Sequence, residues 1–252
     1  MRDAARAAAW RRLVLLAFMP VVSAGCTQAR EEESSETSDI VAGRIETGYP
    51  AVGYLLAGTL PNAPSGPSCG VTLIAENAVV TAAHCIRGHD VFAVSFGIVG
   101  SQPILPVTRV IVHPLAAPNQ PRHDVAVLRL ARSPGITPMP VVAPLVGDRG
   151  VAIGYGRVLG GPKGPGPWGE RKSHSLVVTF QDELNIETRG IDGGTCYGDS
   201  GGPLVIGDGV AGVVWGSPPA EDTECRIESR RLYASLVGED AFLDVALAEA
   251  QD

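Results

Sequence analysis

Short apolar runs, separated by turns rich in glycine and proline, constrain the fold of this chain more than any other feature. The 252 residues include 31 glycines and 20 prolines, whereas aromatic residues make up only 5%. Strands at this spacing, with no long helical pattern between them, are typical of antiparallel barrels or sandwiches. The sequence therefore predicts an all-β fold, with runs at residues 71–74, 78–81, 91–96, 108–112, 125–130, 151–154, 176–179, 204–206, 210–215 and 232–236.

Two stretches depart from this pattern. Residues 239–250 are expected to form a helix, because Phe242, Val245 and Ala246 fall on one face and acidic residues occupy the first turn. Residues 157–173 are dense in glycine and proline and are expected to form an exposed loop.

The amino-terminal segment has the pattern of an export signal. Residues 1–12 carry four arginines, an apolar run follows at 13–22, and small residues precede Cys26. The run is too short to span a bilayer, so residues 1–25 are predicted to be a signal peptide. Two processing routes stay open. Cys26 is lipidated, as in bacterial lipoproteins, or the chain is cut after Ala24 and Cys26 remains a thiol or joins a disulfide. Ser23 fits the lipidation signal poorly.

An acidic segment separates this signal from the folded part. Residues 26–39 hold four glutamates and Asp39 and no large apolar side chain, so they cannot offset the entropy lost on ordering. They are predicted to be a flexible tether or propeptide, and the folded domain is expected over residues 40–252.

Composition limits the classes of partner. Apolar residues make up 45% of the chain, which is ordinary for a globular protein. The net charge is −7 and no stripe of lysine or arginine stands out, so nucleic acid is not an expected partner. No apolar block is long enough for a polytopic membrane protein, so membrane attachment is expected only through a lipid on Cys26. The sequence predicts an exported monomer, in the cell envelope or outside the cell, without metal or cofactor.

Four cysteines remain once Cys26 is set aside, and an exported domain places them in an oxidising compartment. Four cysteines allow three pairings. Sequence proximity favours Cys69–Cys85 and Cys196–Cys225, each of which would contribute about 3 kcal/mol to stability in the chain-entropy model. No C-x-x-C spacing suggests zinc.

Three local strings carry groups suited to nucleophilic catalysis. They are Thr-Ala-Ala-His-Cys at 81–85, His-Asp-Val-Ala-Val-Leu at 123–128 and Cys-Tyr-Gly-Asp-Ser-Gly-Gly-Pro-Leu at 196–204. Taken alone, each string has an ordinary structural role in a turn or at a strand end. Together they supply a hydroxyl, a base and a carboxylate. A serine is inert until an imidazole takes its proton, and the imidazolium needs a carboxylate to orient it.

These strings, in the order His, Asp, Ser, resemble the trypsin/chymotrypsin family of serine proteases. Supporting matches lie at Cys69-Gly70, Gly154-Tyr155-Gly156, 212–216 and Tyr233-Ala234. The resemblance extends from residue 40 to about 236. It implies two antiparallel six-stranded β-barrels, at about 40–130 and 131–238, with the site between them and the helix after them. It also implies the two disulfides that proximity favours.

The resemblance further implies an endopeptidase that cuts protein or peptide substrates through an acyl-enzyme. It assigns His84 as the general base, Asp124 as the orienting carboxylate and Ser200 as the nucleophile. The backbone N–H groups of Gly198 and Ser200 would form the oxyanion hole.

Residues 40–43, Ile-Val-Ala-Gly, resemble the mature amino terminus of the family. Cleavage after Asp39 would free the α-amino group of Ile40, which in the family pairs with the acid before the nucleophile, here Asp199. The uncut chain would then be a weakly active zymogen. The alternative is that Ile40 is an ordinary strand residue and Asp199 only binds N–H groups of its turn.

The substrate pocket is expected to involve Gly194, Thr195, Gly216 and Arg231. Gly194 stands where trypsin-like enzymes carry an aspartate, which argues against a preference for lysine or arginine. Gly216 would leave one wall open. Arg231 would bind an acidic residue before the cut through a bidentate bond, as in acid-specific members of the family, and the chain would then process itself after Asp39. Alternatively, Arg231 turns to solvent among neighbouring arginines, and the pocket takes a medium apolar residue.

The residue before Trp215 departs from the family pattern. Val214 stands where the family has a serine bonded to the catalytic carboxylate, and His123, Thr81 or water are candidates to replace that contact. A catalytically silent binding module is the alternative function, although such proteins usually lose a catalytic residue. An esterase or lipase is disfavoured because its chain order, Ser, Asp, His, is absent.

Overall fold

The computed structural model describes residues 43–60, 67–100, 103–156, 171–218 and 225–250. These residues belong to one structural unit, Glu36–Asp252. The predicted signal peptide, the acidic segment, Cys26 and Ile40 lie outside the described residues, as does most of the predicted loop at 157–173. No helix among the described residues is long and apolar enough to cross a membrane.

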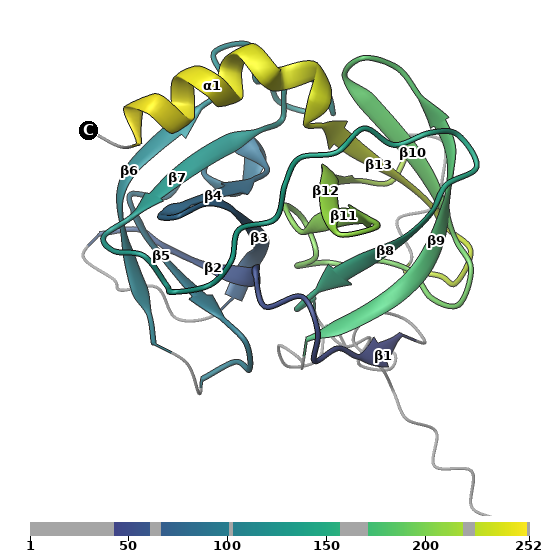
Figure 1. Cartoon of the computed structure of the whole chain (residues 1–252), viewed down its shortest axis with the longest axis horizontal. Coiled ribbons are helices and arrows are strands. Elements are labelled where there is room, and N and C mark those ends of the chain that lie inside the picture. The colour runs from purple at the N-terminus through teal and green to yellow at the C-terminus, as the bar shows by residue number, and fades with distance from the viewer. Residues whose placement is uncertain (1–42, 61–66, 101–102, 157–170, 219–224, 251–252) are drawn as a thin grey trace, which may run out of the picture. The chain divides into compact units, whose positions relative to one another are not determined.

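The first barrel is closed, and its strands pair in the order β2-β3-β4-β7-β6-β5 (Figure 1). All neighbouring strands in it are antiparallel. Its core is dense in β-branched residues, which suit a pleated and half-buried surface. Its elements are β2 (Val52–Gly58), β3 (Pro67–Ala75), β4 (Ala78–Thr81), the 3₁₀ turn η1 (Ala83–Cys85), β5 (Val91–Phe96), β6 (Leu105–Val112) and β7 (Ala126–Leu130).

The second barrel also has six strands, in the order β9-β10-β13-β12-β11-β8, and closes through the pairing of β8 with β9. The short strand β1 (Arg44–Ile45) adds to the outside of β9. The barrel strands are β8 (Arg149–Gly154), β9 (Lys172–Gln181), β10 (Asn185–Gly190), β11 (Pro203–Ile206), β12 (Gly209–Gly216) and β13 (Arg230–Ser235). The prediction of two antiparallel six-stranded barrels is confirmed.

The two barrels share a core. Ile153, Tyr155 and Val205 of the second barrel join the apolar cluster of the first. The rings of Tyr54 and Tyr155 lie 5.0 Å apart, and the Tyr155 hydroxyl donates to the carbonyl of Val52 at 3.2 Å. Because this contact is apolar and hydrogen-bonded, the barrels are held in a fixed relation at the site between them.

After β13 the chain returns to the first barrel. The 3₁₀ turn η2 (Val237–Glu239) leads into α1 (Asp240–Glu249), which lies beside β7 in Figure 1. The helix is present, but its predicted apolar face is wrong at one position. Leu243 and Ala246 are buried, whereas Val245 is 57% exposed. The helix meets the barrel along the line of Leu243, Ala246 and Ala250, which is rotated from the predicted face.

Candidate active site

His84 and Asp124 lie 40 residues apart in the sequence but are hydrogen-bonded. The cause is the antiparallel pairing of β4 with β7, in which Thr81 is the partner of Ala126. His84 follows that pair on one strand and Asp124 precedes it on the other. The His84 Nδ1–H donates to Asp124 Oδ2 at 2.6 Å, and the His84 backbone N–H donates to Asp124 Oδ1 at 2.8 Å.

The Asp124 side chain is 1% exposed and the His84 side chain is 31% exposed. Both carboxylate oxygens of Asp124 accept hydrogen bonds from His84, and these bonds hold the imidazole with Nδ1 toward the carboxylate. The other ring nitrogen, Nε2, is left on the accessible side. A short hydrogen bond between charge-bearing groups is stronger than a neutral one, so the pair is well ordered.

Ser200 lies in a turn that precedes β11 and touches the first barrel. Its carbonyl accepts from Gly70 N–H at 2.7 Å, and Gly201 N–H donates to the carbonyl of Val214 at 2.8 Å. Gly201 has a φ of +74°, and a Cβ there would collide with Thr81 Oγ1. Only glycine permits this approach to the end of β4. The serine precedes a strand, which differs from the strand-to-helix elbow of α/β-hydrolases.

The polar atoms around Ser200 are available for a ligand. Within the described part of the chain, the N–H groups of Gly198 and Ser200 donate to no protein acceptor, and no hydrogen bond joins Ser200 Oγ to His84. Gly198 has a φ of +95°, which favours glycine. Catalytic hydrogen bonds are often long in unliganded enzymes, so the absence of a hydrogen bond between these two described residues is compatible with catalysis.

Asp199, next to Ser200, is 1% exposed, and its carboxylate lies against Gly154 at the end of β8. Its Oδ1 accepts from Gly156 N–H at 2.8 Å and its Oδ2 from Cys196 N–H at 2.7 Å. A Cβ at Gly154 would collide with this carboxylate. The carboxylate thus binds N–H groups of nearby turns; its predicted partner Ile40 lies outside the described residues.

A pocket of about 290 Å³ opens beside Ser200, between the turn before β11 and the ends of β12 and β13. The disulfide Cys196–Cys225 borders it, and Cys69–Cys85 is the second disulfide. These are the pairs that proximity favoured. The pocket is lined by Thr195, Cys196, Tyr197, Ser200, Val214, Trp215, Gly216, Ser217, Pro218, Cys225 and Arg231.

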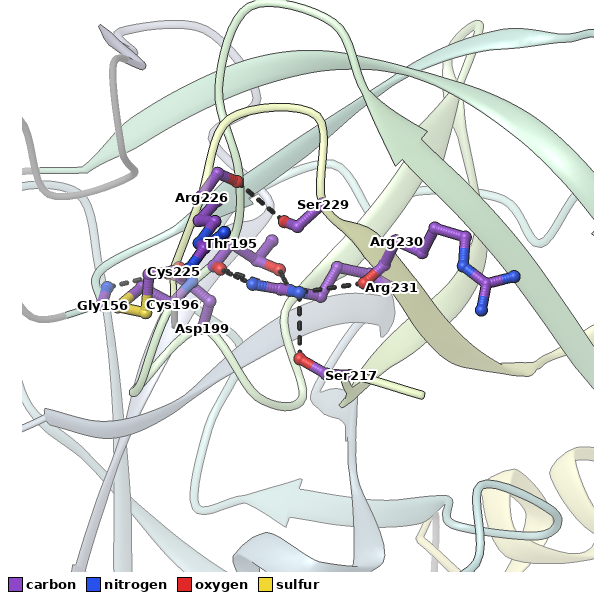
Figure 2. Close-up of a disulfide and its surroundings, with 10 residues drawn as sticks. All are labelled: Gly156, Thr195, Cys196, Asp199, Ser217, Cys225, Arg226, Ser229, Arg230 and Arg231. Carbon is purple, nitrogen blue, oxygen red and sulfur yellow. Dashed lines mark hydrogen bonds between the residues drawn. A yellow bond between two sulfur atoms is a disulfide. The ribbon is translucent and has the colours of Figure 1, made fainter. Parts of the chain in front are cut away.

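Arg231 is a lining residue of this pocket and is 5% exposed. Figure 2 shows its guanidinium directed toward Thr195 and Ser217, while the Arg230 side chain extends away from them. Its Nε donates to Thr195 Oγ1 at 2.8 Å, Nη2 to the Thr195 carbonyl at 2.7 Å and Nη1 to Ser217 Oγ at 2.9 Å. The alternative in which Arg231 turns to solvent is therefore wrong.

Of the other three expected pocket residues, two line the pocket and one does not. Thr195 and Gly216 line the pocket, and a Cβ at Gly216 would meet nothing within 4 Å. Gly194 is buried behind the pocket and is not one of its lining residues, and a Cβ there would collide with the carbonyl of Arg226.

Val214 is 3% exposed and packs in an apolar cluster with Tyr233. Neither expected side-chain substitute reaches Asp124. Thr81 Oγ1 donates to the carbonyl of Gly70, and His123 Nδ1 contacts Glu239. In the described residues, the carboxylate of Asp124 is thus held by His84 alone.

The structure also brings together three side chains that no local string indicated. His113 Nε2 lies 3.0 Å from Glu239 Oε2, and His123 Nδ1 lies 2.8 Å from Glu239 Oε1. Burial raises the pKa of the Glu239 carboxyl above its ordinary value, and burial together with His123 lowers the pKa of His113. Their spacing of 10 and 116 residues carries no sequence signal, because only the return of α1 to the first barrel joins them.

Two described clusters bring three potential metal ligands within 4.8 Å of one another. One comprises Cys69, Cys85 and His84, but its two sulfurs are joined in a disulfide. The other comprises His113, His123 and Glu239.

Several known proteins are similar to this chain. The family model for trypsin matches residues 57–228. Kallikrein-15 of Saguinus oedipus is 29% identical over 201 residues, which cover 62% of this chain and 74% of the relative. Trypsin of Saccharopolyspora erythraea is 33% identical over 174 residues, which cover 59% of this chain and 75% of the relative.

Neutrophil elastase of Mus musculus is 31% identical over 169 residues, which cover 59% of this chain and 62% of the relative. Among solved structures, mouse-brain neuropsin superposes with a TM-score of 0.66 at 22% identity, covering 82% of this chain and 98% of neuropsin. The structural likeness shows the same fold.

Proposed function

Because the chain belongs to the trypsin family, we propose that it is a serine endopeptidase that uses Ser200, His84 and Asp124. The observation that carries the proposal is the 2.6 Å hydrogen bond between His84 Nδ1 and the buried Asp124 carboxylate. This bond leaves Nε2 free to act as the proton acceptor, and the proposed nucleophile Ser200 borders a pocket of about 290 Å³. The similar proteins include a kallikrein, an elastase and a trypsin, which are proteases, and this supports a peptidase function for the chain.

In the proposed reaction, Ser200 Oγ attacks the scissile carbonyl and its proton passes to His84 Nε2. Asp124 stabilises the imidazolium and keeps its Nδ1–H in place. The tetrahedral intermediate collapses when the imidazolium gives its proton to the leaving amine, and an acyl ester on Ser200 remains. Water then repeats the sequence, with His84 again taking a proton, and the carboxylic acid and free serine are released.

The oxyanion of each tetrahedral intermediate would bind the N–H groups of Gly198 and Ser200. These groups have no acceptor within the described residues. A donor fixed in advance needs no rearrangement as charge develops, and removing one such donor typically costs about 3 kcal/mol of transition-state stabilisation.

The substrate residue before the cut is proposed to be aspartate or glutamate. Its side chain would enter the pocket, where the Arg231 guanidinium is held by Thr195 and Ser217. A guanidinium is charged at all working pH values, so it attracts a carboxylate, and burial strengthens this attraction. A lysine or arginine side chain would be repelled.

Activation is proposed to follow cleavage after Asp39, which would release the α-amino group of Ile40. The buried Asp199 carboxylate, adjacent to Ser200, would receive this ammonium. The proposed acidic preference makes self-cleavage after Asp39 feasible. Export through the signal at residues 1–25 fits the two disulfides, and lipidation of Cys26 would then retain the protein at the cell envelope.

The first test is intact mass and amino-terminal sequencing of the purified exported protein, before and after incubation alone. A new terminus at Ile40 that is absent in Ser200→Ala supports an active enzyme that cuts after aspartate. A terminus that stays upstream argues against self-activation. In that case the protein is treated with other proteases and assayed again.

A fluorophosphonate probe and a peptide panel complete the test. Covalent labelling of the wild type, absent in Ser200→Ala, supports the nucleophile, and its absence in both would favour the silent binding module. Cleavage after aspartate or glutamate supports the pocket assignment. Cleavage only after apolar residues would overturn the acidic preference while leaving the peptidase intact.

A further inference from the structure

We propose that His113, Glu239 and His123 form a positioning triad that fixes the backbone around Asp124 from the amino-terminal end of α1. We call these three residues the histidine–glutamate triad. The inference rests on the proposed function, because the placement of Asp124 affects the reaction only if His84 is the general base.

Both oxygens of a buried carboxylate face an imidazole in this triad. Glu239 is 3% exposed. Its Oε1 is hydrogen-bonded to His123 Nδ1 at 2.8 Å, and its Oε2 lies 3.0 Å from His113 Nε2. The two imidazole rings stack with centroids 4.6 Å apart and an interplanar angle of 11°. Phe242 of α1 packs its ring against His113, also with centroids 4.6 Å apart. The cluster therefore binds the start of the helix to the loop that carries Asp124.

The proton positions favour hydrogen bonds over a bound cation. Leu115 N–H donates to His113 Nδ1 at 3.1 Å, so this nitrogen carries the lone pair. A neutral imidazole has one N–H, which must then lie on Nε2, the nitrogen 3.0 Å from Glu239 Oε2. A metal ion at Nε2 would force that proton onto Nδ1, against the Leu115 donor.

The residue before Asp124 is held in an unusual backbone conformation. His123 has a φ of +58°. Residues other than glycine rarely adopt this angle, and it persists only where the surrounding structure stabilises it. Val125 N–H donates to the His123 carbonyl at 2.8 Å, so Asp124 is the central residue of a three-residue turn. The bond from the His123 ring to Glu239 ties this turn to α1.

The residue after Asp124 is held by the same triad. His113 N–H donates to the carbonyl of Val125 at 3.0 Å. Glu239 is thus connected to the backbone on both sides of Asp124. It contacts His123 before Asp124, and it contacts His113, whose N–H binds the carbonyl of Val125 after Asp124. Any shift of this backbone would lengthen the bond from Asp124 to His84, and a displacement of about 1 Å can reduce a rate by about a hundredfold.

The experiment compares Glu239→Ala with Glu239→Gln and Glu249→Ala. Glu249 is a matched control, because it is a carboxylate at the other end of α1 and pairs with Arg109 on β6. We expect kcat of Glu239→Ala to fall about ten- to a hundredfold with KM unchanged. Glu239→Gln should recover most of kcat, because an amide oxygen can accept from His113 while its N–H₂ donates to His123 in the other tautomer. Glu249→Ala should keep the wild-type kcat.

A second variant distinguishes loss of the triad from a failure of Glu239→Ala to fold. His123→Gly adopts the left-handed backbone without strain but lacks the ring, and we expect it to lose kcat as Glu239→Ala does. All rates are divided by the fraction of folded protein from thermal melting. Wild-type kcat in both variants would overturn the triad, as would equal losses in kcat and folded fraction. Zinc that raises the melting temperature of the wild type but not of His113→Gln would overturn it in favour of a cation site.

A spectroscopic readout separates this proposal from the proposed function. A proton in a hydrogen bond as short as that between His84 and Asp124 resonates far downfield in ¹H NMR. If the wild type hydrolyses no peptide, the proposed function fails, yet this resonance still reports the placement of Asp124. We expect it to shift or broaden in Glu239→Ala and His123→Gly and to stay unchanged in Glu249→Ala. An unchanged signal in all variants would overturn the triad.

Discussion

The two barrels surround their buried charges with different partners. On the side of the first barrel, the buried carboxylates of Asp124 and Glu239 are bonded to imidazoles. In the second barrel, the Asp199 carboxylate accepts from backbone N–H groups, and the Arg231 guanidinium donates to hydroxyl and carbonyl oxygens. Imidazoles gain and lose protons near neutral pH, whereas amides and hydroxyls do not. The first barrel is therefore suited to moving protons and the second to presenting fixed charge to a substrate.

The site depends on the contact between these two environments. A Cβ at Gly70 in β3 would lie 2.6 Å from the Cα of Gly202, and Gly70 N–H donates to the Ser200 carbonyl. Because the backbones touch here, the turn that carries the proposed nucleophile Ser200 lies against the barrel that carries His84 and Asp124. Changes to the His84–Asp124 pair of the first barrel should therefore affect rate without selectivity, whereas changes to Arg231 in the pocket of the second barrel should affect selectivity.

The largest expected effect is that of Asp124→Asn on kcat. The amide cannot stabilise the imidazolium and imposes the wrong tautomer on His84, and the loss in Ser-His-Asp enzymes is about ten-thousandfold. The ratio of kcat/KM between acidic and apolar substrates should stay the same, because the pocket is untouched. Steady-state kinetics on a matched pair of peptides measures both quantities. A changed ratio would contradict the expectation that the His84–Asp124 pair affects rate without affecting selectivity.

The next effect is on selectivity, in Arg231→Gly. Hydrogen bonds to a charged group contribute about 1.5–3 kcal/mol, so kcat/KM for substrates with aspartate before the cut should fall roughly ten- to a hundredfold. The value for an apolar substrate should not fall. Arg230→Gly is the control, since Arg230 extends away from the pocket and pairs with Glu187 at 3.2 Å. Equal losses in both variants would contradict the pocket assignment.

A smaller effect concerns His174 in β9, the imidazole that departs from the pattern of the second barrel. Burial lowers its pKa from 6.5 to about 4. Between these values the unfolded chain binds a proton that the folded chain does not, so stability is complete above about pH 6.5 and is lost as the pH falls toward 4. The loss at about pH 5 is about 2 kcal/mol.

His174→Leu removes this titration, so its free energy of unfolding should depend less on pH than that of the wild type. Urea unfolding at neutral and acidic pH measures the difference. An unchanged pH dependence would mean that other groups, such as the histidine–glutamate triad, dominate acid destabilisation.

The smallest effect is expected from Arg109→Ala. Its pair with Glu249 joins β6 to the end of α1 at 2.8 Å, but both side chains are 44% exposed. Exposed pairs contribute about 0–1 kcal/mol and weaken with salt. The melting temperature should hardly change and kcat should stay the same. A marked loss of activity would mean that the far end of α1 also positions the site.

Most barrel strands were predicted from local pattern, but two were not: β2, whose sequence VGYLLAG is apolar, and β10, whose sequence is polar. The run at 91–96 coincides with β5, because its apolar residues and flanking turns act locally. Strand β10 (Asn185–Gly190) was not among the predicted runs, since its sequence NIETRG contains four polar residues. It is a strand because β9 and β13 supply hydrogen-bonding partners on both sides. The face of α1 was misplaced for the same reason, because contact with the barrel, and not the helix period alone, selected Leu243 over Val245.

The sequence by itself determined the residue types at the ends of the strands: a histidine, an aspartate and a serine framed by glycines, which are local strings with a definite chemistry. It also favoured the disulfides, since nearby cysteines meet most readily. Only the tertiary structure decided that Arg231 faces the pocket while Arg230 faces away. It also decided that Glu239 meets His113 and His123. These contacts arise where β12, β13 and α1 cross other elements, and the free energy of such packing is not encoded in any short stretch of chain.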